Sequence, residues 1–242
     1  MESLETTIRA ATEAHMRERP AERVFSLDID GEKFWVKRKL GNGRKQLVKY
    51  SVEKEFFYEI ARMTIASRNC PDLVPEMVVL TPDYMVTRDG GPMLKSWLDK
   101  DISEEEKEAI LEKAGASLAR LHEKDIVHGR PALRDMTWDG EHMAFLDWEN
   151  RMYAKSREEQ KAIDFILMLH GIGRENYANE KDRMRAVFKG YENQGGASII
   201  QEAKGFLQKH SFVGTVTEKL APFKMKDVES VRKVYEFLLG DQ

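Results

Sequence analysis

The amino-acid sequence predicts an α+β fold, with a small antiparallel sheet in the first third of the chain and helices in the remainder. Four short β-rich runs are grouped in pairs around two turn signals: 23–29 and 32–37 around Asp30-Gly31, and 77–80 and 84–87 around Thr81-Pro82-Asp83. Asp-Gly between such runs is typical of a hairpin turn, because glycine accepts positive φ. After Gly90 the apolar residues recur at helical spacing instead.

Helical periodicity extends over most of the chain. Ser103 and Glu106 form a capping box that starts one long helix, and its apolar stripe runs through Leu118 and Leu121. Further helices are predicted at 2–18, 52–67, 157–171, 180–192, 197–209 and 226–239, with a glycine-containing loop at 41–43. The chain is therefore expected to form a β-rich lobe, 1–87, and a helical lobe, 88–242, joined by a hinge at 88–91.

Composition narrows the class of protein. The 242 residues are 41% hydrophobic and carry a net charge of −3, so a core can form and no basic field favours nucleic acid. The single cysteine, Cys70, excludes internal disulfides and favours a reducing, cytoplasmic location. No apolar run reaches about 18 residues, so no transmembrane segment is expected, although peripheral association with a membrane stays open.

The most informative stretch is 118–149. His128-Gly129 follows the end of a predicted helix, and Asp135 comes seven residues after His128. Twelve residues later, behind a short apolar run, comes Asp147. Two carboxylates around a hairpin can converge on one Mg²⁺, which indicates phosphoryl transfer from ATP.

This stretch resembles the passage from helix to catalytic loop in atypical small kinases: the Kdo/WaaP and InaA-like lipopolysaccharide kinases and the RIO group. Their His-Gly-Asp-x4-Asn and Ile-Asp-Phe motifs correspond to His128-Gly129-Arg130-x4-Asp135 and Leu146-Asp147-Trp148. The resemblance extends from about residue 23 to 169. It implies a two-lobed protein-kinase-like fold and an ATP- and Mg²⁺-dependent phosphotransferase.

The resemblance also implies roles for individual residues. Asp135 and Asp147 would bind Mg²⁺, His128 would brace the loop, and Asp164 would hold the loop backbone. Lys37 would contact the α- and β-phosphates, with Glu55 preferred over Glu53 and Glu59 as its ion-pair partner. Adenine would stack near Val86, Arg88 and Asp89, with backbone groups of the hinge reading its edge. Each position also has a simpler interpretation: a strand-end or surface-loop aspartate, a strand lysine, a solvated helix glutamate.

Two departures from the family pattern matter. Arg130 replaces the aspartate that accepts the proton of the attacking hydroxyl, and arginine cannot act as a base near neutral pH. Arg130 or Arg134 could clamp a phosphate instead, and Asp135 could serve as the base. No G-x-G-x-x-G precedes Lys37, which implies a lid over the phosphates built by the N-terminal helix.

The function therefore has open alternatives. The acceptor could be a saccharide, a lipid-linked saccharide or a protein hydroxyl. The segment between Trp148 and Asp164 is short, which argues against a peptide-docking platform and leaves small-molecule, saccharide or autophosphorylation targets. The chain could instead be a pseudokinase that binds nucleotide and has a regulatory role. A helical interaction protein with accidental aspartates is the third alternative.

Overall fold

The chain divides into two compact units, Met1–Gly91 and Pro92–Gln242, in the computed structural model. The structure describes residues 3–40, 52–152, 154, 156–175, 177–211 and 226–240, and the loop predicted at 41–43 lies outside them. The division falls at the end of the predicted hinge rather than at residue 87. No helix in these ranges is long and apolar enough to cross a membrane.

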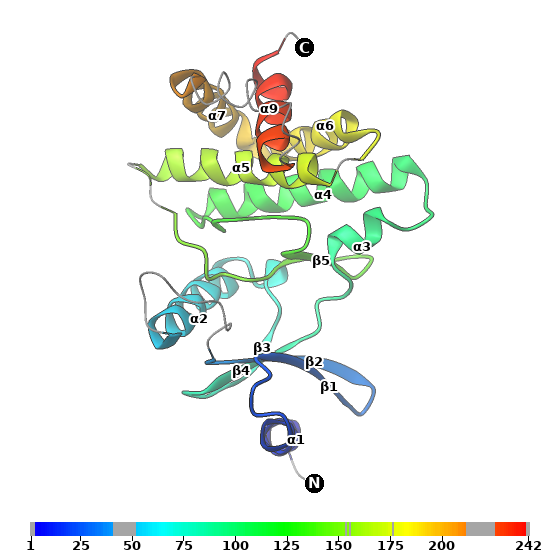
Figure 1. Cartoon of the computed structure of the whole chain (residues 1–242), viewed down its shortest axis with the longest axis vertical. Helices are drawn as coiled ribbons and strands as arrows, with labels where there is room; N and C mark the ends of the chain where they lie inside the picture. Colours follow the sequence, from blue (N-terminus) through cyan, green and yellow to red (C-terminus); the bar gives the residue numbers. More distant parts are fainter. Residues whose placement is uncertain are drawn as a thin grey trace. The chain divides into compact units, whose positions relative to one another are not determined.

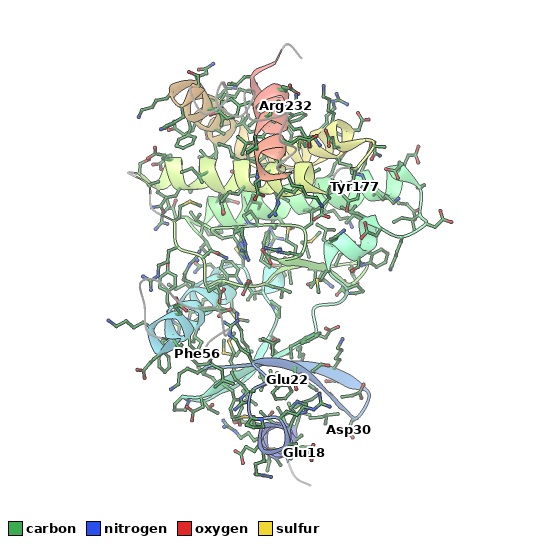
Figure 2. The ribbon with its side chains drawn as sticks, viewed as in Figure 1. Glu18, Glu22, Asp30, Phe56, Tyr177 and Arg232 are labelled. Atoms are coloured by element: carbon green, nitrogen blue, oxygen red, sulfur yellow. The ribbon has the colours of Figure 1, made fainter. Side chains whose placement is uncertain are left out.

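The first unit contains an antiparallel sheet of the order β1-β2-β4-β3, which confirms the predicted α+β class. Its strands are β1 (Val24–Ile29), β2 (Glu32–Arg38), β3 (Met77–Leu80) and β4 (Tyr84–Arg88). Asp30 lies at the tip of the β1–β2 hairpin (Figure 2). Asp30 and Gly31 have φ values of 55° and 80°, as a tight two-residue turn requires.

Helix α1 (Leu4–Glu18) and helix α2 (Val52–Asn69) lie on opposite faces of this sheet (Figure 1). Ile8 of α1 is fully buried against Phe34 and Val36 of β2. Because side chains alternate along a strand, Lys37 points to the other face. The expectation that the N-terminal helix forms a lid over the Lys37 face is therefore wrong, since that helix covers the opposite apolar face.

The second unit is mainly helical and carries one short hairpin. Its elements are α3 (Leu94–Leu98), α4 (Glu104–Glu123), β5 (Met136–Trp138), β6 (Met143–Phe145), α5 (Arg157–Arg174), α6 (Glu180–Tyr191), α7 (Ala197–Lys209) and α9 (Lys226–Leu239). Two shorter helical turns are η1 (Pro71–Leu73) in the first unit and η2 (Glu192–Gly196) here. The capping box predicted at Ser103 and Glu106 is present. Helices α7 and α9 pack on α5, and α6 packs on α4 (Figure 1).

The contact between α4 and α6 depends on glycine. A Cβ atom on Gly190 of α6 would lie 1.9 Å from the backbone oxygen of Glu112 on α4. In the reverse direction, a Cβ atom on Gly115 of α4 would lie 2.1 Å from the backbone oxygen of Val187. Backbone atoms cannot move aside as a flexible side chain can, so the two helices approach this closely only because both positions lack a side chain.

We predict that Gly190→Ala lowers the free energy of unfolding by about 2 kcal/mol, the usual cost of overpacking. Gly205→Ala on α7 is the matched control, because nothing lies within 4 Å of the Cβ position there. The control should stabilise the protein by about 0.5–1 kcal/mol through helix propensity. Denaturant midpoints measure both effects; equal midpoints for the two variants would contradict the close approach of α4 and α6.

Candidate functional site

The loop after α4 is organised by one buried carboxylate, that of Asp164 on α5. This side chain is fully buried and accepts hydrogen bonds from the backbone amides of His128 (2.5 Å) and Gly129 (2.7 Å). A charged acceptor makes stronger hydrogen bonds than a neutral one. The predicted role of Asp164, holding the loop backbone, is confirmed.

Two further buried side chains complete the environment of Asp164. His122 of α4 places Nε2 3.1 Å from Asp164 Oδ2 and Nδ1 2.5 Å from the Tyr191 hydroxyl. A carboxylate only accepts, so Nε2 of the ring donates to Asp164, and the Tyr191 hydroxyl can donate to Nδ1. Burial raises the pKa of Tyr191 far above its ordinary value, which keeps this donor protonated. The chain Tyr191–His122–Asp164 thus fixes the position of the carboxylate.

The loop itself lies tightly against the segment that follows β6. Gly129 has φ 93°, and a Cβ atom there would lie 2.6 Å from the backbone oxygen of Asn150. The His128 imidazole places Nε2 2.7 Å from the backbone oxygen of Leu146 and stacks edge-on with Trp148. His128 therefore braces the loop against the residues around Asp147, as predicted.

The β5–β6 hairpin brings the two predicted carboxylates together. Asp135 ends the loop immediately before β5, and its backbone oxygen accepts from the amide of Leu146 (2.8 Å), the residue before Asp147. Asp147 has a left-handed backbone, φ 65°. Such a conformation is uncommon for residues other than glycine and is often found at functional sites.

Arg130 lies between these two carboxylates. Its Nε is 3.0 Å from Asp135 Oδ2, and its Nη2 is 3.2 Å from Asp147 Oδ2. Arg134 lies further away, with Nε 3.8 Å from Asp135 Oδ1. Asp135 is 6% exposed, and burial raises its pKa above the ordinary value although Arg130 acts to lower it. The structure thus brings together His128, Arg130, Asp135 and Asp147 in one loop and hairpin.

This arrangement bears directly on the predicted magnesium site. Carboxylate oxygens are suitable ligands for Mg²⁺. However, one oxygen of each aspartate already accepts an N–H of the same guanidinium. No group of three or more His, Cys, Asp or Glu side chains that could hold a metal occurs in the described part of the chain. Mg²⁺ does not fit between Asp135 and Asp147 while Arg130 bridges them.

The first unit contains the predicted lysine–glutamate ion pair, with a different glutamate. Lys37 Nζ donates to Glu59 Oε1 at 2.6 Å, and the two side chains are 14% and 3% exposed. The preference for Glu55 is corrected to Glu59, which lies one helical turn further along α2. Glu59 is the buried position of that turn, whereas Glu55 is half-buried. Sequence spacing alone does not distinguish two glutamates on one side of a helix.

The three residues predicted to bind adenine all make contacts within the first unit. Val86 is fully buried in the core beneath α1. The amides of Arg88 and Asp89 each donate to a backbone oxygen of the first unit at 2.9 Å. The Arg88 side chain pairs with Glu76 at 2.6 Å, and the Asp89 carboxylate accepts from the Trp35 indole at 2.5 Å. Both amides therefore have backbone partners within the first unit, and adenine binding at these residues stays a prediction.

Two residues of the site were missed by sequence reasoning, His122 and Tyr191. His122 follows Leu121 at the end of an apolar stripe, and a polar residue beside such a stripe signals a buried hydrogen bond. Tyr191 gave no such signal, because its partner lies 69 residues earlier in the chain.

We predict that Asp164→Asn lowers the free energy of unfolding by about 3 kcal/mol, as expected for a broken buried network. An amide has one acceptor oxygen for three converging donors, so at least one buried donor loses its partner. Denaturant unfolding measures this effect.

The matched control is Asp139→Asn at the exposed turn between β5 and β6. There one carboxylate oxygen accepts the amides of Glu141 and His142, both at 2.7 Å, and an asparagine oxygen can do the same. The control should change the free energy of unfolding by less than about 0.5 kcal/mol. Equal effects of the two substitutions on the free energy of unfolding would contradict the conclusion that Asp164 organises the loop.

The comparisons with known proteins give one relative and no named activity. No protein-family model matches the chain. A protein of Haemophilus influenzae, described as an uncharacterized protein, is 30% identical to this chain over 222 residues, which is 90% of each protein. This chain therefore belongs to the same protein family as the Haemophilus influenzae protein.

Proposed function

We propose that the protein is an ATP-dependent phosphotransferase of the kinase-like type, which transfers the γ-phosphate to a hydroxyl group of a saccharide, a lipid-linked saccharide or a protein. The observation that carries the proposal is the braced loop of the second unit. Asp164 fixes its backbone, His128 ties it to the hairpin, and two carboxylates with one arginine converge at its end. Such rigid support is what a catalytic group needs for precise positioning.

The chemistry assigned to each residue follows from its charge and surroundings. The oxygen of the acceptor hydroxyl forms a bond to the γ-phosphorus, and the bond between the γ-phosphorus and the bridging oxygen of ADP breaks. The hydroxyl proton goes to Asp135, because a carboxylate with a raised pKa is a stronger base than an ordinary one. Arg130, which cannot accept a proton, would stabilise the charge on the transferring phosphoryl group.

The first unit would contribute Lys37. A buried ion pair with a glutamate holds the ammonium group in one position. In the resembling kinases such a lysine contacts the α- and β-phosphates of ATP. We assign Lys37 this role, with Glu59 as its positioning partner.

The location of the protein forms part of the same proposal. Cys70 is buried and forms no disulfide, which fits a reducing compartment such as the cytoplasm. ATP is available there. A lipid-linked acceptor would bring the protein to a membrane surface from that side without a spanning helix.

A second function is favoured by one specific observation. The position of the usual catalytic base carries Arg130, and that arginine pairs with both carboxylates. Such a protein could bind ATP and, through this binding, regulate its interactions with other molecules without transferring phosphate. This nucleotide-binding regulator is the alternative to the phosphotransferase.

We predict that Asp147→Asn lowers the rate of ATP turnover by at least about 100-fold, because an uncharged amide no longer fixes the Arg130 guanidinium. Its melting temperature should stay close to that of the wild type, since the side chain is 30% exposed. Asp139→Asn, which changes an acid at the other end of the hairpin, should keep wild-type turnover. Release of labelled phosphate measures the rates; wild-type turnover in Asp147→Asn would show that the carboxylate is only structural.

Arg130 variants separate the two functions. In an active enzyme, Arg130→Ala should reduce phosphate transfer, and Arg130→Asp should not restore it, because a third carboxylate beside Asp135 and Asp147 adds repulsion. In a regulator, the wild-type protein transfers nothing, and Arg130→Asp supplies the missing base. The three proteins are compared with γ-labelled ATP and candidate acceptors. Transfer gained only in Arg130→Asp would overturn the phosphotransferase in favour of the regulator.

A further inference from the structure

The Arg130 guanidinium holds two carboxylates that would otherwise repel each other. Asp135 and Asp147 carry two negative charges, and each places its Oδ2 within 3.2 Å of a nitrogen of Arg130. Arg134, 3.8 Å from Asp135, supplies a second positive charge. The four side chains together are neutral, so no further cation is needed to offset the carboxylates.

The backbone of Arg130 keeps the guanidinium close to this position. Its amide donates to His128 Nδ1 at 3.4 Å, and its backbone oxygen accepts the amide of Ala132 at 2.8 Å. Pro131 follows and restricts the conformation of Arg130. The arginine is therefore attached to a fixed loop, and its side chain is 37% exposed.

A divalent metal on the same oxygen atoms is incompatible with this pairing. Mg²⁺ requires oxygen ligands at about 2.0–2.1 Å in near-octahedral geometry. A metal that bridged both Oδ2 atoms would need the space and the lone pairs that the guanidinium uses. It would also stand beside two arginines, and the repulsion between these positive charges opposes its binding.

We propose that Arg130 is the resident cation of this site and takes the place of a divalent metal between Asp135 and Asp147. The wild-type chain then binds no Mg²⁺ or Mn²⁺ at these carboxylates, and removal of the guanidinium opens a metal site. Of the five N–H groups of the guanidinium, two donate to the aspartates, which leaves three that do not donate to these carboxylates. These three groups suit the oxygens of a phosphate; only this last part rests on the proposed function.

The test is a titration with Mn²⁺, without nucleotide, followed by the electron paramagnetic resonance signal of free Mn²⁺. The proteins are the wild type, Arg130→Ala, Arg130→Gln, Arg130→Ala combined with Asp147→Asn, and Arg134→Ala. Arg134→Ala is the matched control, because it removes a nearby arginine but leaves the bridge intact. We expect saturable binding of one Mn²⁺ per chain in the two Arg130 single variants, and none in the other three proteins.

Three outcomes would overturn the proposal. Saturable binding of one Mn²⁺ by the wild type, absent from the double variant, would show that the guanidinium does not exclude metal. If Arg134→Ala binds Mn²⁺ as well as Arg130→Ala does, the loss of any nearby positive charge is sufficient, and the bridge formed by Arg130 is not what excludes the metal. The third is absence of binding in both Arg130 single variants although circular dichroism shows them folded, since the carboxylates would then lack the geometry of a metal site. Because no nucleotide is present, these outcomes are independent of whether the protein transfers phosphate.

Discussion

The buried carboxylate of Asp164 is the interaction on which the candidate site depends. A charged group with no exposure to solvent is costly unless it is hydrogen-bonded, and here two loop amides and the His122 ring donate to it. Each donor comes from a segment that the chain must bring to α5: the end of α4 and the loop after it. The hydrogen bonds therefore set the conformation of the loop, including the positive φ of Gly129. They also fix the point from which the loop runs toward the β5–β6 hairpin.

The position of Arg130 follows from that constraint. Once the loop is fixed at Gly129, the next residue extends its side chain toward Asp135 at the end of the loop and Asp147 after the hairpin. The hairpin closes through the amide of Leu146 and the backbone oxygen of Asp135, so the two carboxylates share one cation. An aspartate at position 130 would change the balance of charge from neutral to strongly negative. The identity of residue 130 therefore determines the electrostatics of this part of the loop.

Much of the fold follows from periodicity and turn chemistry. The helix 226–239 and the strand 77–80 were predicted with their observed ends, because apolar spacing and turn residues mark them. Helix α3 was missed because five residues carry no periodic signal. The convergence of Asp135 and Asp147 was predictable from the hairpin between them. The preference for Glu55 was wrong because both it and Glu59 share one side of α2, and only packing decides which is buried.

The most direct test of the central claim is binding of ATP to the wild-type chain, measured by isothermal titration calorimetry in the presence of Mg²⁺. Under the proposed function, the chain should bind one ATP through the Lys37–Glu59 pair and the loop held by Asp164, and Lys37→Ala should weaken this binding. Absence of any binding heat at several temperatures, from protein that circular dichroism shows to be folded, would contradict the account. It would leave the loop as a structural feature of a protein with another function.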